Sequence, residues 1–153
     1  MLVWRLVKPE FAPGLDGVGA RRVGGRWNSP GQAMVYCTSS LALAALEYFV
    51  HVPPTMRQAD RMPPLRAVGL TLLASAGIEY FPFRFGARFP DIEDSRSFGD
   101  DWLATHRTVA LSVPSRVVPF EQNILLNPAH VGMVSVEVTE QFDFDFDSRL
   151  GQG

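Results

Sequence analysis

The chain has 153 residues and a mass of 16.9 kDa, which leaves room for a single domain over residues 1–153. Hydrophobic residues make up 46% and charged residues 20%, an ordinary globular composition that excludes wholesale disorder. The net charge of −2 argues against a protein whose main task is to grip nucleic acid or an anionic membrane, because both tasks require a basic face.

The cysteine content and the amino terminus indicate the cellular compartment in which the protein is expected. The single cysteine, Cys37, cannot form an internal disulfide or a zinc cluster, and its isolation is typical of a reducing environment. The amino terminus lacks the apolar run and small-residue cleavage site of a secretory signal. The longest apolar stretch, Leu41–Leu46, is too short to cross a bilayer. We therefore expect a soluble, cytoplasmic protein, and we expect no metal.

The first half of the chain predicts two short strands and one helix around a glycine-rich segment. Leu2–Leu6 alternates weakly between apolar and polar residues, as a short strand does. Phe11–Gly31 contains six glycines and is expected to be a long structured loop. Ala33–Tyr36 is a brief apolar strand. A Thr-Ser-Ser run then offers N-caps to a helix at Leu41–His51, which stops before a pair of prolines.

The second half predicts further short strands. Glu79–Ser97 shows turn signals without a clear period and is expected to be irregular, whereas Asp100–Arg107 is expected to be helical. Strands are expected at Leu65–Leu73, Val109–Val113, Met133–Val138 and Phe142–Asp147, the last of which alternates perfectly between phenylalanine and aspartate. Many short strands with two or three helices predict an α+β fold.

The densest cluster of candidate binding residues is Gly24–Gly31. Its glycines let the backbone approach a ligand closely and expose N–H groups to an anion. Arg26 can clamp a phosphate, and the chain's thirteen arginines against one lysine favour such a contact. Trp27 can pack on a planar ring or simply anchor the loop. The alternative is a surface loop pinned by a buried tryptophan.

Glu47 is the most informative single residue. It lies in an otherwise apolar helical run, where an unpaired carboxylate would be costly. Helical spacing places it one turn beyond Leu43 and Ala44, on a side that faces the interior or a cleft. A carboxylate there needs a partner, for which arginine is the obvious candidate. The alternatives are a structural ion pair or simple exposure to solvent.

Common catalytic signatures are missing from the sequence. It contains no P-loop, HExxH motif, Cys/His cluster or G-x-S-x-G elbow. The three histidines stand in unrelated contexts and are expected on the surface or at caps. An enzyme of this kind would use polar side chains on a substrate that already carries its reactive group.

A set of short motifs runs along nearly the whole chain. They are W-R-L at Trp4–Leu6, G-G-R-W-N at Gly24–Asn28, V-Y-x4-L-A-x4-E at Val35–Glu47, V-P-S at Val113–Ser115, N-x-L-L-N-P-x-H at Asn123–His130 and D-S-R-L at Asp147–Leu150. In this order the chain resembles the RES-domain toxins of bacterial RES–Xre type II toxin–antitoxin systems. A proline is more usual after Asp147, a departure that touches no catalytic position.

The resemblance implies an ADP-ribosyltransferase-like domain of two small, mainly antiparallel sheets that bind NAD between them. Family members degrade NAD or transfer its ADP-ribose to a protein. The positions that match the family's functional residues are Arg5, Arg26, Tyr36, Glu47 and Ser115. It also implies an Xre-like helix-turn-helix antitoxin whose carboxyl end plugs the site, and a homodimer or larger assembly is plausible.

The chemistry of NAD suits these residues. In NAD the nicotinamide is bonded to ribose as a cationic pyridinium, so it is already a good leaving group. Cleavage passes through an oxocarbenium-like state that a carboxylate such as Glu47 stabilises. We expect Glu47, Arg5 and Tyr36 to be catalytic, with Tyr36 stacking on the nicotinamide ring. Residues expected to bind the dinucleotide are Arg26, Trp27, Asn28 and Ser115. Ser115 has no recognisable base beside it, so we do not expect a nucleophile.

Each assignment has a simpler alternative. Arg5 could be a structural partner of Glu47, and Tyr36 an ordinary strand aromatic. Asn123 and Asn127 are expected to cap turns beside a proline rather than to touch substrate. For function, the first hypothesis is NAD cleavage by hydrolysis or phosphorolysis, which depletes NAD and arrests growth. The second is ADP-ribosylation of a protein, and the third is a binding module without catalysis.

Overall fold

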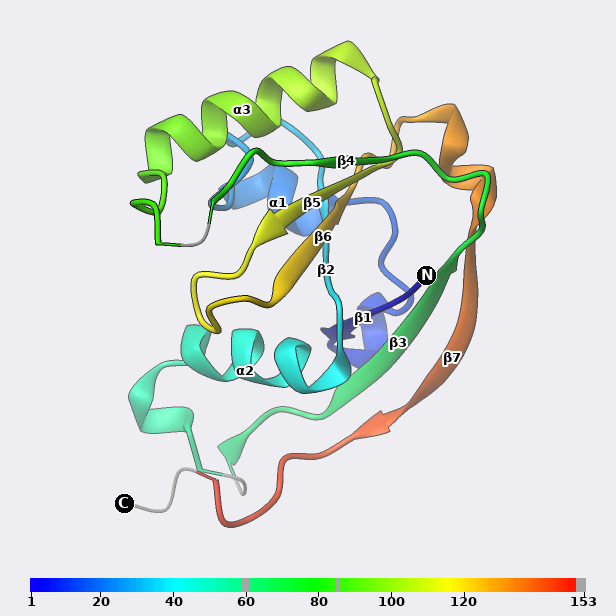
Figure 1. Cartoon of the computed structure of the whole chain (residues 1–153). Coiled ribbons are helices and arrows are strands. Elements are labelled where there is room, and N and C mark those ends of the chain that lie inside the picture. Colours follow the sequence, from blue (N-terminus) through cyan, green and yellow to red (C-terminus); the bar gives the residue numbers. More distant parts are fainter. Residues whose placement is uncertain (59–60, 85, 151–153) are drawn as a thin grey trace.

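The computed structural model of the chain describes residues 1–58, 61–84 and 86–150 and has a mixed α+β fold (Figure 1). The strands are β1 Leu2–Val7, β2 Val35–Thr38, β3 Leu65–Leu72, β4 Ile78–Tyr80, β5 Ala110–Pro114, β6 Gln122–Leu126 and β7 Val136–Phe144. The α-helices of these ranges are α1 Val18–Val23, α2 Leu41–His51 and α3 Ile92–Thr105, with 3₁₀ turns at Pro9–Phe11, Pro54–Met56 and Val131–Ser135.

The strands form one seven-stranded sheet in the order β4-β5-β6-β2-β1-β3-β7. All neighbours are antiparallel except β4 and β5, which are parallel. A single residue pair, Trp4 with Thr38, joins β1 to β2, whereas β1 and β3 share six pairs. The sheet is therefore two smaller, mainly antiparallel halves that touch at one point, and the expected α+β fold is confirmed.

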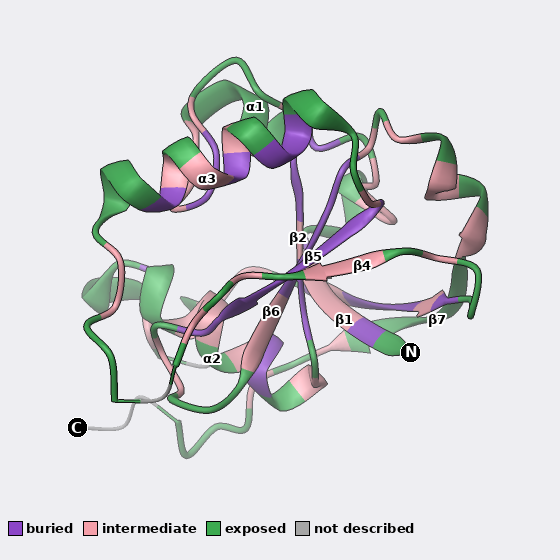
Figure 2. Ribbon diagram, turned by 45° about the horizontal axis from the view of Figure 1, so that its top comes forward, coloured by how far each residue is buried: buried purple, intermediate pink, exposed green. Residues whose placement is uncertain are grey.

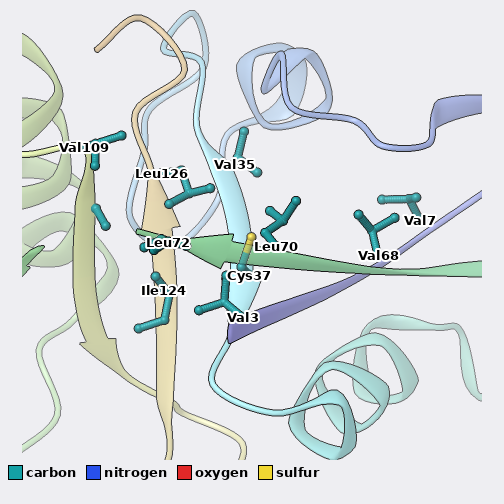
Figure 3. Close-up of a cluster of buried hydrophobic side chains, with 11 residues drawn as sticks. Val3, Val7, Val35, Cys37, Val68, Leu70, Leu72, Val109, Ile124 and Leu126 are labelled. Atoms are coloured by element: carbon teal, nitrogen blue, oxygen red, sulfur yellow. The ribbon is translucent and has the colours of Figure 1, made fainter. Parts of the chain in front are cut away.

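The main core lies between the two halves of the sheet (Figure 3). One half contributes Val3, Val7, Val68, Leu70 and Leu72, and the other contributes Val35, Cys37, Val109, Ala110, Ile124 and Leu126. Because side chains alternate along a strand, Val3, Arg5 and Val7 of β1 point to the same, core-facing side. The packing of the two halves therefore directs a guanidinium group toward the interior.

A second core lies beneath α3. It contains Trp27, Met34, Trp102, Leu103, Leu111, Val113 and Leu125. Figures 1 and 2 show α3 and α2 on opposite sides of β5 and β6. The glycine-rich loop is anchored in this second core through Trp27, which is 2% exposed.

Helix α2 forms where the sequence predicts it. The Ser40 hydroxyl accepts a hydrogen bond from the backbone N–H of Leu43 at 3.1 Å and caps the first turn. The helix ends at His51, before Pro53 and Pro54. Its apolar side packs toward the sheet through Leu43 and Ala44, both buried. This places Glu47, one turn further along the helix, in a half-buried position beside the sheet.

Three other expectations are corrected. The expected loop Phe11–Gly31 contains the short helix α1 between Gly17 and Gly24, whose φ angles of 66° and 72° suit glycine. The expected irregular segment Glu79–Ser97 includes the end of β4 and the start of α3, whose first turn is capped by the Asp91 carboxylate. Helix α3 therefore begins eight residues before the expected Asp100.

The last strand is also displaced. Met133–Ser135 belongs to a 3₁₀ turn, and β7 begins at Val136. The alternating segment Phe142–Asp147 was expected to be strand throughout, but β7 ends at Phe144. The pairing partner explains this end, because β3 begins at Leu65, opposite Phe144. In the part of the chain that is described, no helix is both long and apolar enough to span a membrane.

Candidate functional site

The carboxylate of Glu47 is held by two uncharged side chains. Its Oε1 atom accepts a hydrogen bond from the Ser115 hydroxyl at 3.0 Å and one from the Asn123 side-chain amide at 2.8 Å. Within the described ranges Glu47 forms no ion pair, so the expectation of an arginine partner is wrong. Two neutral donors satisfy one oxygen and leave the other without a donor from the described residues.

Ser115 has no hydrogen-bonding capacity to spare. It lies directly after β5 and is 5% exposed. Its one hydroxyl hydrogen is donated to Glu47, and its oxygen accepts the backbone N–H groups of Val117 and Val118 at 3.1 and 3.0 Å. A serine hydroxyl offers one hydrogen and two lone pairs, all of which are used here. Ser115 thus holds Glu47 in place, and a ligand contact would require one of these bonds to break.

Asn123 is a site residue that the sequence reading missed. It was expected to cap a turn, but it lies in the middle of the sheet on β6, where it pairs with Thr38 and donates to Glu47. Its Oδ1 atom is buried and accepts no hydrogen bond from any residue that the structure describes. Asn127 does cap the following turn, since its Oδ1 accepts from the Ala129 N–H at 3.1 Å. Asn123 lies within β6, a strand that was not predicted from the sequence, whereas Asn127 directly follows that strand.

Tyr36 is fixed through its hydroxyl. The hydroxyl donates to Asn28 Oδ1 at 2.7 Å and accepts from the Trp27 backbone N–H at 3.0 Å. Burial raises the pKa of Tyr36 to about 12, so the phenol stays neutral near pH 7. Gly25 packs so closely that a Cβ there would lie 2.8 Å from Tyr36 Cζ. The tight loop thus determines where the ring of Tyr36 lies.

Trp27 and Asn28, both expected to bind a dinucleotide, lie inside the protein. Asn28 is fully buried, and its amide nitrogen donates to the carbonyls of Ala20 and Gln32, each at 2.9 Å. Trp27 makes an edge-on contact with Phe81, with ring centroids 4.8 Å apart. Trp27 and Asn28 anchor the loop, and the Tyr36 hydroxyl is held by the Asn28 side chain and by the backbone N–H of Trp27. This agrees with the alternative of a loop pinned by a buried tryptophan.

Arg5 lies on β1 where that strand leaves β2. The antiparallel pairing of β1 with β2 consists of the single pair Trp4–Thr38. Arg5, the next residue along β1, is therefore not paired with Cys37 of β2. One terminal nitrogen of Arg5 donates to the carbonyl of Gly14, and its buried Nε atom finds no acceptor within residues 1–58, 61–84 and 86–150. Burial lowers the pKa of Arg5, which remains a cation at neutral pH.

Two arginines flank one aromatic ring at the entrance to the site. The guanidinium carbons of Arg26 and Arg116 each lie 5.3 Å from the centroid of Phe89. Arg26 also donates weakly to the Pro90 carbonyl at 3.4 Å. Neither arginine forms a salt bridge with another described residue. Arg116 was missed by the sequence reading, because nothing near it in the sequence relates it to Arg26.

Three adjoining cavities share these residues. A cavity of about 160 Å³ opens where β1 and β2 part and is lined by Arg5, Tyr36, Glu47 and Asn123 among others. A second, of about 340 Å³, is lined by Tyr36, Glu47, Asn123 and both Arg26 and Arg116. The largest, of about 810 Å³, lies between the Phe11–Gly17 segment and α1 and also reaches Arg5 and Tyr36. Tyr36 therefore borders all three.

The arrangement brings most of the expected residues together. Arg5, Arg26, Trp27, Tyr36 and Glu47 line two cavities that share Tyr36 and Glu47. Ser115 supports Glu47, and Asn28 supports Tyr36. Among the described residues, the carboxylate keeps one oxygen without a donor and these arginines form no salt bridge, so that together with the fixed aromatic ring they can hold a charged, ring-bearing ligand. Among the described residues no group of three His, Cys, Asp or Glu side chains is placed to hold a metal ion.

Comparison with protein families identifies the chain. The family model described as RES domain matches residues 2–147. The chain belongs to the RES domain family. Every site residue named above lies within the part of this RES domain that the family model matches.

Relatives of this RES domain are similar over nearly their full length. It is 38% identical to the Prs ADP-ribosylating toxin of Sphingobium sp. (strain YBL2) over 153 aligned positions, which cover 96% of the chain and 94% of the relative. It is 30% identical to the Toxin Res proteins of Photorhabdus laumondii and Yersinia enterocolitica, with 98% of the chain covered in each case and 97% and 99% of the relatives.

A solved structure shares the fold. A chain of the crystal structure of the M. tuberculosis MbcT–MbcA toxin–antitoxin complex superposes with a TM-score of 0.65, covering 94% of this chain and 83% of that one. The sequence identity is 17%, so this likeness concerns the fold alone.

Proposed function

We propose that this protein is the toxin of a toxin–antitoxin system and that its substrate is NAD, which it cleaves at the bond between nicotinamide and ribose. The names of the relatives support the first part, since they are toxins and one is an ADP-ribosylating toxin. ADP-ribosylation uses NAD as its donor, so the same substrate serves both of the enzymatic hypotheses.

The observation that carries the proposal is the environment of Glu47. Its Oε1 is fixed by Ser115 and Asn123, while its Oε2 receives no hydrogen bond from the described residues. The carboxylate borders two cavities that also contain the fixed ring of Tyr36 and several cations. A preorganised carboxylate of this kind stabilises positive charge that develops on a sugar carbon.

In the proposed reaction, the bond from ribose C1′ to the pyridinium nitrogen breaks, and nicotinamide leaves as a neutral molecule with the electron pair. The free oxygen of Glu47 accepts a hydrogen bond from a ribose hydroxyl and faces the oxocarbenium-like carbon. Water then adds its oxygen to C1′ and releases a proton, which yields ADP-ribose. Tyr36 stacks on the nicotinamide ring, and its two hydrogen bonds keep the ring of Tyr36 from turning away.

The rest of the dinucleotide needs an anion site and room for a nucleotide. Arg26 and Arg116 provide two guanidinium groups without acidic partners next to the Glu47 cavity, and we assign the pyrophosphate to them. The cavity of about 810 Å³ provides space for the ADP half. Asn28 and Ser115 act through the residues that they hold rather than by touching the ligand, whereas Trp27, although largely buried, also lines the cavity beside Glu47.

Transfer of ADP-ribose to a protein is the second candidate, favoured by the name of the Sphingobium relative. The two reactions differ only in what attacks C1′: water, or a side chain of an acceptor protein. NAD labelled in its adenine ring, incubated with the purified protein with and without cell lysate, distinguishes them. Free labelled ADP-ribose without lysate supports cleavage, label that enters protein only with lysate supports transfer, and intact NAD in both tubes contradicts both.

We further propose a small antitoxin partner of the Xre-like helix-turn-helix kind, whose carboxyl end enters the site. The likeness to a chain of a toxin–antitoxin complex supports a partner of some kind. A peptide carboxylate suits the two arginines at Phe89. A binding module without catalysis remains the third hypothesis, and it predicts that toxicity survives substitution of Glu47.

A further inference from the structure

Asn123 has two ends with different surroundings. Its amide nitrogen donates to Glu47 Oε1 at 2.8 Å. Its Oδ1 is buried, has no hydrogen-bond partner in the described part of the chain, and belongs to a residue that lines both smaller cavities. A carboxylate accepts hydrogen bonds and cannot donate them, so the amide must present nitrogen to Glu47 and direct its oxygen elsewhere.

An unpartnered buried acceptor is unusual in a folded protein. Leaving such a group without a donor is costly, and exceptions of this kind are concentrated where a ligand or water completes the bond. Among the described residues only three buried side-chain atoms lack a partner: Arg5 Nε, Arg66 Nε and Asn123 Oδ1. Arg66 forms an ion pair with Asp143 at the far strand of the sheet. The other two residues line the same cavity of about 160 Å³.

These two atoms have complementary chemistry. Asn123 Oδ1 needs a donor, whereas Arg5 Nε carries a hydrogen that needs an acceptor. A primary carboxamide supplies both, because its NH₂ donates and its carbonyl oxygen accepts. A carboxylate in the same position supplies no donor for Asn123. A ribose hydroxyl bonded to Glu47 would leave Asn123 Oδ1 unsatisfied.

We infer that Asn123 Oδ1 and Arg5 Nε recognise the carboxamide of nicotinamide, so that Asn123 is a specificity-determining residue as well as a support for Glu47. This inference rests on the proposed function. The Asn123 side chain then donates a hydrogen bond to the Glu47 carboxylate through its nitrogen and accepts one from the leaving group through its oxygen. The position of the leaving group is thereby tied to the position of Glu47.

The test compares NAD with the dinucleotide in which 3-acetylpyridine replaces nicotinamide. That analogue keeps the carbonyl but has a methyl group where the carboxamide has NH₂. For the unaltered protein we expect kcat/KM to be roughly tenfold to a hundredfold higher for NAD, because the analogue leaves Asn123 Oδ1 without a donor. A ratio for the unaltered protein no higher than that of the uncatalysed reactions would overturn the inference, and this comparison needs no variant.

Two substitutions make the test specific. Asn123→Ala is expected to slow both reactions and to bring the ratio of the two kcat/KM values close to that of the uncatalysed reactions. Ser115→Ala, the matched control, also removes a hydrogen bond to Glu47 but leaves Asn123 Oδ1 in place, so it is expected to slow both reactions and keep the original ratio. Any intrinsic difference between the two pyridines cancels when the ratios are compared.

The outcomes separate this inference from the proposed function. If the protein consumes NAD and Asn123→Ala keeps the original ratio, the inference is wrong and the proposed function stands. If the unaltered protein neither consumes nor binds either dinucleotide, both are wrong. Inhibition by the free pyridines gives a second measurement: nicotinamide is expected to inhibit the unaltered protein at least tenfold more strongly than nicotinic acid or 3-acetylpyridine. Equal inhibition would contradict the carboxamide contact.

Discussion

Ser115 and Glu47 are 68 positions apart in the sequence and are joined by a hydrogen bond of 3.0 Å. The bond links the end of β5 to α2, on the side of the sheet opposite α3. Because the hydroxyl also accepts two backbone N–H groups, its direction is fixed before any ligand arrives. The structure thus orients a carboxylate with neutral groups and leaves its charge available.

Removing this support is expected to lower activity without unfolding the protein. Ser115→Ala should reduce kcat for NAD cleavage by about tenfold, with a smaller effect on KM, because Glu47 loses one of its two donors. Ser112→Ala is the matched control, since Ser112 is also buried on β5 but donates to Gln122 at 3.3 Å and does not touch Glu47. Equal losses in the two variants would contradict a specific role for Ser115.

The arginine pair is expected to act on binding. Arg26→Lys and Arg116→Lys each keep the charge but lose the planar fork, so each should raise KM for NAD several-fold with a smaller change in kcat. The double substitution to alanine should raise KM further and weaken the dependence of KM on salt concentration. Arg149→Ala is the control, because Arg149 is exposed and bonded to Asp147. An unchanged KM in both lysine variants would exclude the proposed pyrophosphate site.

Gly25 is expected to tolerate no side chain. In Gly25→Ala, the new Cβ would lie 2.8 Å from Tyr36 Cζ and 2.9 Å from Asn28 Oδ1, so we expect a loss of about 1–3 kcal/mol in the free energy of unfolding and a displaced Tyr36. Gly19→Ala is the control: a Cβ there meets nothing within 4 Å, and the helical position should gain about 0.5–1 kcal/mol. Urea unfolding measures both variants. Equal stability of the two would contradict the close packing against Tyr36.

Alkaline pH is expected to destabilise the fold through Tyr36. Burial raises the pKa of Tyr36 from 10.0 to about 12, so the unfolded chain loses this proton at lower pH than the folded one. The free energy of unfolding should therefore fall between pH 10 and 12, by about 1 kcal/mol at pH 11 from this residue. Below pH 10 this contribution is fully present.

Cys37 titrates in an overlapping range and must be separated. Burial raises the pKa of its thiol from 9.0 to about 11, which lowers stability in the same direction between pH 9 and 11. We therefore propose urea unfolding at pH 8 and 11 in a Cys37→Ala background, with and without Tyr36→Phe. The variant with phenylalanine should lose less stability on going to pH 11. An identical loss in both proteins would show that Tyr36 is not the titrating group.

Local patterns in the sequence were enough to predict some of the fold. The Ser40 cap, the apolar run and the following prolines define α2, and with it the position of Glu47. The start of α3 was missed because Ile92–Gly99 mixes acidic, basic and small residues around only a few buried positions. Helix α1, with six residues, is too short for a period to be recognised.

The site itself depended on contacts that no local pattern contains. Asn123 bonds a residue 76 positions away, and Arg26 and Arg116 meet only through the ring of Phe89. The motif resemblance pointed to residues that the fold brings together, but not to the contacts that hold them. Ser115 and Asn28 prove to be supports with satisfied hydrogen bonds, which only the three-dimensional neighbours reveal.

The role of Glu47 is tested most directly by nicotinamide release from NAD in the purified protein and its Glu47→Gln variant. Glutamine keeps the oxygen that accepts from Ser115 and Asn123 and removes only the charge, so the fold should be preserved. We predict a rate at least about 100-fold lower in the variant, with an unchanged melting temperature. A variant that releases nicotinamide within a few-fold of the unaltered rate would contradict the role of this carboxylate.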